Sequence, residues 1–400
     1  MTSTASTATT TTSPKPAWGA IWSIAIVIAA LSASELLPAS LLTPMASSLN
    51  VSEGLIGQSV TATAILAVAT SLLVAPLSRR YNRRPLLLIF GGALIASNLV
   101  VAIAPNATIM LSARLVLGIT LGGVWGLAAS LALRLVPSTS VPRALSIIFG
   151  GSTVAAIAAA PLGALFGDVV GWRAVFAGVA VVCAAAVAFQ YFVLPSMAPL
   201  GGSRKVEVKA VLLLPGLIPG MAAVLLFWGG AYSFNTYIRP YLEGVSGVNS
   251  SELSVVLLCF GVASFVGTLL AAPLMQWNLR LVLPITAAAQ AVLLLALLLL
   301  GQSWIAAAAL IASWGLFVGM AGVGWSTWVA RSYPEHAEST GGLLVAAIQV
   351  AMMSGALFGG ALIDGINPAA PLLAATIILA GAAFYTGLIM RPHRKDPKHS

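Results

Sequence analysis

Long apolar runs separated by short polar breaks make up most of the chain. Dividing the 400 residues at these breaks gives twelve apolar blocks, and about 20 such residues suffice for a helix to cross a membrane. Because lipid offers no partner for backbone amides, we expect each block to form an α-helix. The continuous runs argue against a membrane β-barrel, which would show ten-residue alternation. The blocks cover residues 20–45, 53–77, 85–104, 107–134, 142–167, 172–194, 211–238, 251–276, 281–300, 303–331, 339–364 and 369–390.

The composition supports the same class of protein. Charged residues make up 7% of the chain and hydrophobic residues 59%, whereas roughly 25% of an average soluble domain is charged. So few charges cannot cover a surface that faces water. This excludes a soluble enzyme, a nucleic-acid binder and a disordered scaffold. The predicted fold class is an all-α polytopic membrane protein in a lipid bilayer.

The distribution of basic residues predicts the orientation. If the N-terminus lies inside, sixteen of the 19 Lys and Arg residues fall in inner segments; Arg173 and Arg239 fall in outer segments, and Arg114 falls within a span. Basic residues concentrate on the cytoplasmic side of membrane proteins. We therefore expect a multi-pass protein of the cell inner membrane with both termini in the cytoplasm. The net charge of +9 is then an orientation signal, because the basic residues are scattered among short loops.

An internal repeat divides the chain into two halves. Residues 75–77, Ala-Pro-Leu, recur at 272–274, which is 197 residues later, and Gly118 and Gly122 recur as Gly315 and Gly319 at the same offset. Such repeats are typical of transporters whose substrate site lies between two halves. We expect two six-helix bundles related by an axis along the membrane normal. The predicted segments are a disordered cytoplasmic tail at 1–19, a bundle at 20–194, a cytoplasmic linker at 195–210, a bundle at 211–390 and a cytoplasmic tail at 391–400.

Two local motifs resemble those of the major facilitator superfamily. The segment APLSRRYNRRPLL at 75–87 is similar to its loop signature Gly-x-Leu-x-Asp-x-x-Gly-Arg-Arg/Lys. Arg83 and Arg84 match, whereas Arg79 replaces the aspartate of the family's charge-relay gate. Arg114 and Gly118 match the family's Arg-x-x-x-Gly motif in the fourth span. The resemblance implies twelve helices in two pseudo-symmetric bundles.

Longer segments resemble one group within that superfamily, the drug:proton antiporters, and most closely its purine ribonucleoside efflux pumps. The resemblance is dense over the first 195 residues and weaker afterwards. It implies export of purine ribonucleosides in exchange for protons. Related sugar exporters share the Glu-x-x-Pro segment, so sugars or amphipathic drugs are the alternative cargo. The segments are ELLPASLLTPM (35–45), VSEGLIGQSVTATA (51–64), RLVLGITLGGVWG (114–126), VPRALSIIFG (141–150) and GWRAVF (171–176).

Glu35 is the one acid deep inside a predicted span. A charge at the bilayer centre costs about 2.5–3.5 kcal/mol on insertion scales, and a carboxyl avoids this cost by taking up a proton. We therefore predict Glu35 to be the proton-coupling residue, with a capped acid near the outer end of the span as the alternative. Pro38 and Pro44 follow it, which predicts a kinked helix.

Arg114 is the one cation inside a predicted span. It is either a gate or counter-charge for Glu35, or a structural residue that bonds carbonyls of a neighbouring helix. Glycines follow it at intervals of four residues, a spacing that lets two helices approach closely. Asp168 and Asp364 end the fifth and eleventh spans at matching repeat positions, and we expect them to cap loops.

A small solute should meet a few polar groups among aromatic side chains. Asn and Gln amides can pair with a purine edge, and aromatic faces can stack on it. The same side chains also anchor helices at membrane interfaces or join helices to each other. Our substrate-binding candidates are Trp228, Tyr232, Asn235, Trp325, Trp328 and Gln349.

Other kinds of chemistry have no motif in the sequence. There is no Gly-x-x-x-x-Gly-Lys-Ser/Thr phosphate loop, no His-Glu-x-x-His metal motif and no Gly-x-Ser-x-Gly nucleophile turn. We therefore expect no enzyme activity, no cofactor, no metal site and no nucleic-acid partner. The prediction is a monomeric secondary transporter that exchanges a small organic solute for protons by alternating access. An uncoupled facilitator is the lesser alternative. A channel should line a continuous polar pore, and the predicted spans are too apolar for that.

Overall fold

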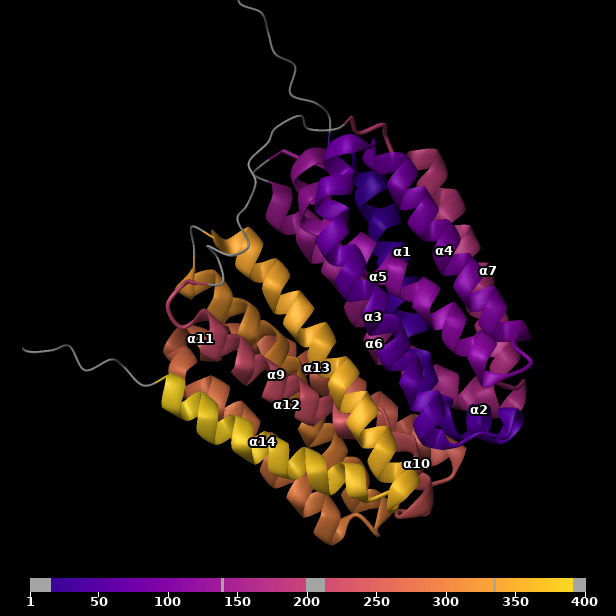
Figure 1. Ribbon diagram of the computed structural model, residues 1–400, viewed down its shortest axis with the longest axis vertical. Helices are drawn as coiled ribbons and strands as arrows, with labels where there is room; N and C mark the ends of the chain where they lie inside the picture. The colour runs from indigo at the N-terminus through magenta and orange to yellow at the C-terminus, as the bar shows by residue number, and fades with distance from the viewer. Residues whose placement is uncertain (1–15, 138–139, 199–212, 334–335, 391–400) are drawn as a thin grey trace, which may run out of the picture.

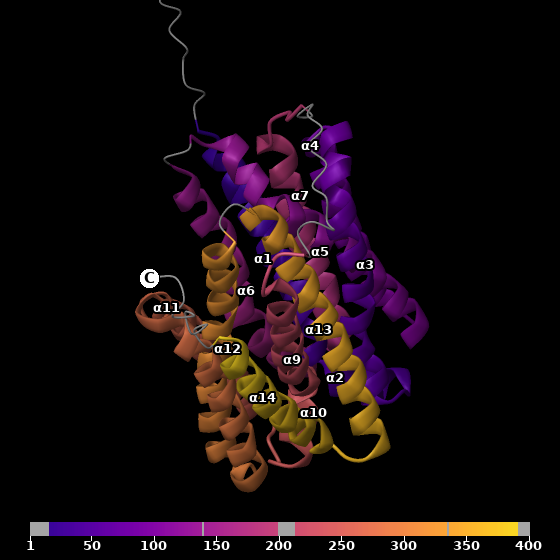
Figure 2. The ribbon, with the colours of Figure 1, turned by 60° about the vertical axis from the view of Figure 1, so that its left-hand side comes forward.

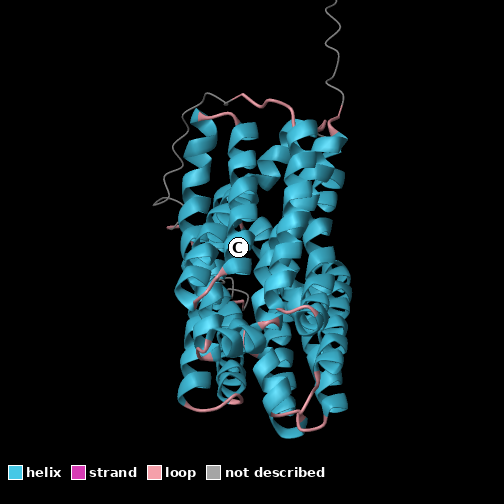
Figure 3. Cartoon of the chain, turned by 90° about the vertical axis from the view of Figure 1, so that its right-hand side faces the viewer, coloured by secondary structure: helices cyan, strands magenta, loops and turns pink. Residues whose placement is uncertain are grey.

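The computed structural model describes residues 16–137, 140–198, 213–333 and 336–390, and every regular element within them is a helix (Figures 1 and 3). Most of the predicted tails and of the predicted linker lie outside these residues. The helices are α1 (Trp18–Ser40), α2 (Leu42–Leu49), α3 (Glu53–Arg80), α4 (Arg83–Ile103), α5 (Ala107–Leu135), α6 (Val141–Val169), α7 (Trp172–Val193), α9 (Leu217–Asn235), α10 (Ile238–Gly244), α11 (Ser250–Leu300), α12 (Trp304–Ser332), α13 (Ala337–Gly365) and α14 (Ala370–Ile389).

The described residues contain twelve helical segments that are long and apolar enough to cross a membrane, and each matches one predicted block. Large apolar side chains cover much of the outer surface; Phe192, Leu299 and Phe384 are each more than 70% exposed. Such a surface needs lipid around it. The predicted all-α polytopic fold class is therefore confirmed.

Two of the predicted blocks end earlier than the apolar pattern indicates. The first span ends at Ser40 and the seventh at Asn235, and a short helix, α2 or α10, follows each. The breaks have nearly the same backbone geometry, with φ −108° and ψ 10° at Leu41 and φ −110° and ψ 20° at Tyr237. These dihedrals lie in the sparsely allowed bridge region, which interrupts a helix. The apolar run continues past each break, so hydropathy alone could not reveal it.

The internal repeat reappears in the packing of helix pairs. A methyl group added at Gly118 of α5 would overlap the Thr63 carbonyl of α3, and one added at Gly315 of α12 would overlap the Phe260 carbonyl of α11. The partners, like the glycines, are 197 residues apart in the sequence. Gly122 with Ala67 and Gly319 with Ser264 repeat the same contact one turn later. The glycines are therefore needed because helix backbones touch at these points.

Helices α1–α7 form a first half and helices α9–α14 a second half, and the halves converge at one end of the molecule (Figure 1). The short helices α2 and α10 lie at this end, and we call it the Arg239 end after a residue of α10. The opposite end, where α7 ends and α9 begins, is the linker end. One cluster of buried apolar residues belongs to the first half and another almost wholly to the second. A third cluster joins Leu37, Leu41 and Ile56 to Tyr237 and Ile363 at the Arg239 end. Within the second half, α9 lies between α13 and α14 (Figure 2).

Candidate functional site

A small cavity lies between the two halves, next to the Arg239 end. Its volume of about 20 Å³ gives room for roughly one water molecule, since a water needs about 10–15 Å³ of such volume. The cavity brings together three predicted site residues, Glu35 of the first half and Tyr232 and Asn235 of the second. Tyr232 is the repeat mate of Glu35, 197 residues later. The cavity is lined by Glu35, Leu36, Ala39, Val60, Tyr232, Asn235, Thr236 and Met352.

Pro38 explains where the Arg114 side chain binds. A proline inside a helix has no N–H for the carbonyl four residues earlier, and for Pro38 this is the carbonyl of Ser34. The guanidinium of Arg114, on α5, donates from Nη1 to that oxygen at 2.8 Å and from Nη2 to the Glu35 carbonyl at 3.4 Å. Arg114 is 1% exposed. It therefore bonds backbone oxygens of a neighbouring helix.

The Glu35 carboxyl has no ion pair within 4.0 Å among the residues that the structure describes. Both ion pairs in the described part of the chain involve Arg239. Arg114 contacts Glu35 by the hydrogen bond to its backbone oxygen. The Nε atom of Arg114 has no hydrogen-bond partner among the described residues. Glu35 is thus a partly buried carboxyl between the halves, and no cation of the described residues lies within ion-pair distance of it.

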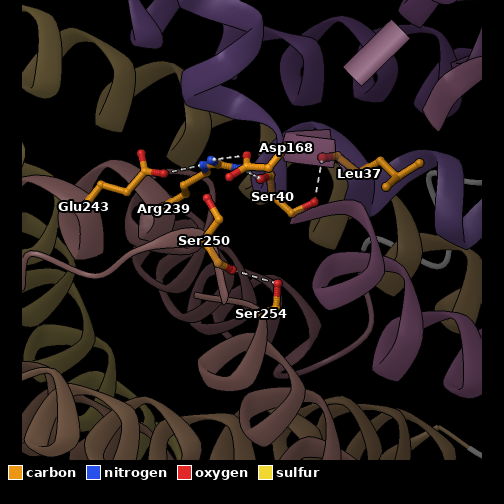
Figure 4. Close-up of polar contacts among 7 residues, drawn as sticks. All are labelled: Leu37, Ser40, Asp168, Arg239, Glu243, Ser250 and Ser254. Atoms are coloured by element: carbon orange, nitrogen blue, oxygen red, sulfur yellow. Dashed lines mark hydrogen bonds and ion pairs between the residues drawn. The ribbon is translucent and has the colours of Figure 1, made fainter. Parts of the chain in front are cut away.

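Arg239 of α10 contacts both halves at the Arg239 end (Figure 4). Its Nη2 atom lies 3.5 Å from Oδ1 of Asp168, at the end of α6, and its Nε atom lies 2.8 Å from Oε1 of Glu243. Its Nη1 atom donates to the carbonyl of Ser40, the last residue of α1. Arg239 is 3% exposed. We call the contact of Arg239 with Asp168 and Ser40 the Arg239 latch.

Asp364 makes a second contact between the halves. From the end of α13, its Oδ2 atom accepts from the Ser52 hydroxyl at 2.6 Å and its Oδ1 atom from the Gly54 amide at 3.0 Å. Ser52 is the N-cap of α3, so Asp364 satisfies an amide of a helix start in the other half, where the helix dipole favours negative charge. We call this contact the Asp364 latch.

The two latches correct our expectation that Asp168 and Asp364 cap loops. Both carboxylates stand at the C-terminal ends of their helices, where the helix dipole disfavours an acid. Their partners lie in the opposite half and compensate for this position. The matching repeat positions were the signal in the sequence, but Arg239 and Ser52 gave no local sign of being their partners.

The predicted tryptophans lie mainly inside the second half. The rings of Trp325 and Trp328 are 5.8 Å apart, and Trp325 also lies 6.2 Å from Phe227. Trp228 is buried beside Tyr232, with 6.1 Å between the ring centroids. None of the three lines the small cavity. Gln349, on α13, is partly exposed. The structure thus groups Tyr232 and Asn235 with Glu35 and places the tryptophans in the core behind them.

Arg83 and Arg84 lie in the first turn of α4 at the linker end, not in a loop. The side chain of Asn82 caps this helix by accepting from the Arg84 amide at 3.0 Å. Arg84 donates to the Tyr191 carbonyl at 2.9 Å and lies over the Tyr191 ring. Arg83 is 6% exposed, and its Nε and Nη1 atoms have no hydrogen-bond partner within the described part of the chain.

A larger cavity of about 520 Å³ lies between α6 of the first half and α11 and α12 of the second. Small-molecule sites usually measure about 300–1,000 Å³. It lies on the linker side of the point where α6 and α11 touch, at Ile157 and Gly261. None of the candidates predicted from the sequence lines it. The protein therefore has a site-sized cavity between the halves toward the linker end and is closed at the Arg239 end.

Comparison with known proteins identifies the family. A model of the Major Facilitator Superfamily matches residues 22–341 and 220–400. The chain belongs to the Major Facilitator Superfamily. This match confirms the resemblance seen in the two local motifs. The two halves described above have the architecture on which transporters of this superfamily are built.

The relatives and a solved structure agree with this assignment. The chain is 40% identical over 358 residues to the purine ribonucleoside efflux pump NepI of Salmonella paratyphi C (strain RKS4594), covering 90% of each chain. It is 41% identical over 379 residues to the transcription regulatory protein OpdE of Pseudomonas aeruginosa, covering 94% of each. The crystal structure of a D-xylose–proton symporter matches with a TM-score of 0.75 at 14% identity, covering 92% of this chain and 96% of that chain. The chain is a multi-pass Major Facilitator Superfamily transporter with homology to a purine ribonucleoside efflux pump.

Proposed function

We propose that this transporter exports purine ribonucleosides in exchange for protons by alternating access. The observation that carries the proton exchange is the Glu35 carboxyl, which lines a cavity between the halves and has no ion pair with any described residue. The choice of cargo rests on the 40% identical relative that is named a purine ribonucleoside efflux pump.

In this proposal Glu35 carries the proton across the interface. When the Arg239 end opens, the small cavity connects to that side and the carboxyl binds a proton from it. When the Arg239 end closes, the proton leaves toward the linker end. Tyr232 and Asn235 of the second half line the same cavity as Glu35 of the first half. A solute that binds between Glu35 and these two residues would therefore push the halves apart.

The two latches hold the Arg239 end closed in this scheme. Alternating access needs the halves to rock against each other around a fixed site, and the Arg239 and Asp364 latches must break for that end to open. A membrane potential of 100 mV supplies about 2.3 kcal/mol per proton. This energy is close to the cost of exporting a neutral solute against a hundredfold concentration gradient, which is about 2.7 kcal/mol.

The basic residues support the orientation of the cycle. Arg83, Arg84 and Arg134 lie near the linker end, at helix ends, and such residues concentrate on the cytoplasmic side. We place the linker end and both termini in the cytoplasm and the Arg239 end outside. The described conformation is then the one from which cytoplasmic solute is taken up.

Sugars are the second candidate cargo. Hydroxyl side chains line the larger cavity together with apolar and small residues, and no charged side chain is among the lining residues that the structure describes. A site of this kind fits a neutral hydroxylated solute, and it disfavours a charged amphipathic drug, whose charge would be unpaired.

The test is transport by purified protein in proteoliposomes. An imposed pH difference should drive accumulation of radiolabelled inosine by the wild type, and Glu35→Gln should abolish the pH-driven part while keeping inosine binding. Glu252→Gln is the matched control, because Glu252 caps α11 within its own half. Normal pH-driven rates in Glu35→Gln would disprove the proton role. If the protein accumulates pentoses but not inosine, the cargo is a sugar and the nucleoside assignment is wrong.

A further inference from the structure

The polar groups that line the larger cavity between the halves are side-chain hydroxyls. Five hydroxyl side chains line it, and they come from all three surrounding helices. The other lining side chains are Phe149 and small or aliphatic residues. The hydroxyls belong to Ser152 and Thr153 of α6, Thr268 of α11, and Ser326 and Thr327 of α12.

Four of these hydroxyls already use their single hydrogen. Thr153 donates to the Phe149 carbonyl at 3.1 Å, Ser326 to Gly322 at 2.9 Å, Thr327 to Val323 at 2.7 Å and Thr268 to Ser264 at 3.0 Å. A hydroxyl has one donor and two acceptor lone pairs. Once its hydrogen is bonded to its own helix, it can offer a ligand only its lone pairs.

The fifth hydroxyl differs from the other four, because it accepts a hydrogen bond and so keeps its own hydrogen for an acceptor on the ligand. Ser152 accepts from the Ser32 hydroxyl of α1 at 3.0 Å. Because none of the described residues that line the cavity is charged, a charged ligand would lose its hydration without gaining a counter-ion from them. The lining therefore selects a neutral solute that brings several O–H or N–H donors, and it disfavours a solute that brings acceptors alone.

We propose that this cavity binds the ribose of the solute, whose three hydroxyls donate to acceptors among Thr153, Thr268, Ser326 and Thr327 while the base lies against Phe149. This assignment rests on the proposed function and deepens it. Ribose brings three O–H donors, and Phe149 supplies the aromatic face on which a base can stack. The ring of Trp125 lies 5.5 Å from that of Phe149 and supports its position.

The first test compares two nucleosides on the wild-type protein. We would measure binding of inosine and of 2′,3′-dideoxyinosine to the purified full chain in nanodiscs. A net hydrogen bond changes affinity by about 3- to 10-fold. Dideoxyinosine lacks two donors, so it should bind about 10- to 100-fold more weakly. Equal affinity for the two nucleosides would overturn the proposal.

The second test removes the acceptors from the protein. Thr153→Val and Thr327→Val keep the approximate side-chain shape and delete the oxygen, so each should weaken inosine binding about 3- to 10-fold. Binding of dideoxyinosine should change much less. Thr376→Val is the matched control, because Thr376 makes the same bond to its own helix, 2.9 Å to the Leu372 carbonyl, on α14 away from the cavity. Equal losses in the control and the cavity variants would overturn the proposal.

Binding of D-ribose distinguishes failure of this inference from failure of the proposed cargo. If the wild type binds D-ribose but not inosine, and the threonine variants weaken that binding, the nucleoside cargo is wrong and the donor-selective cavity stands. If the wild type binds neither probe, the cavity assignment is overturned.

Discussion

The Asp364 latch allows a quantitative test of the closed Arg239 end. Asp364→Ala removes two hydrogen bonds to a carboxylate, from the Ser52 hydroxyl and the Gly54 amide. Hydrogen bonds to charged groups are worth about 1.5–3 kcal/mol when buried; because Asp364 is exposed, we take about 1 kcal/mol for each. Losing about 2 kcal/mol should shift the equilibrium toward an open Arg239 end by about 30-fold.

Cysteine labelling measures this shift. Ala39 lines the small cavity, so Ala39→Cys reports when the cavity opens to the Arg239 side. The native Cys183 and Cys259 would be replaced by serine. A membrane-impermeant maleimide added from that side should label Ala39→Cys about 30-fold faster in Asp364→Ala, if opening precedes labelling as a rapid equilibrium.

Glu252→Ala provides the control for the labelling experiment. Glu252 lies at the same end, but it accepts from the Asn249 amide at the start of its own helix, at 2.9 Å. Its removal weakens a helix cap without breaking a contact between the halves. Unchanged labelling in Asp364→Ala, or the same acceleration in Glu252→Ala, would refute the reasoning that Asp364 holds the halves together.

Two further predictions concern the interior of the first half. Arg114→Met should lower the free energy of unfolding by about 1.5–3 kcal/mol, because it leaves the buried Ser34 carbonyl without a donor. In a Pro38→Ala background the same change should cost about 1 kcal/mol less, since the alanine at position 38 then supplies an N–H to that carbonyl. Thermal unfolding of the four proteins measures this coupling, and strictly additive losses would contradict it. Gly118→Ala should destabilise the protein by about 1–3 kcal/mol, because the added methyl group overlaps a backbone carbonyl. Gly92→Ala, where nothing lies within 4 Å, should be neutral or stabilising, and equal melting temperatures for the two variants would contradict the prediction.

Local pattern was enough to predict the spans and to select Glu35 as a candidate site residue. Each apolar block became one span, because a helix in lipid must satisfy its own backbone over a fixed length. Glu35 could be selected from sequence alone because an acid in an apolar span is costly. Tyr232 could be linked to it through the repeat offset, and both line the same cavity. Trp325 gave no comparable signal, since a tryptophan in a span suits a binding site and a helix core equally well.

The amino-acid sequence by itself determined the membrane class, the twelve spans and the glycine positions where helix backbones touch, because periodicity, length and residue size act over a few turns of one helix. Only the tertiary structure decided which polar groups meet between the halves. Ser52 and Asp364 are 312 residues apart, and Arg239 meets Asp168 across the same interface. Such pairs depend on how two large bundles pack against each other, and no local pattern carries that information.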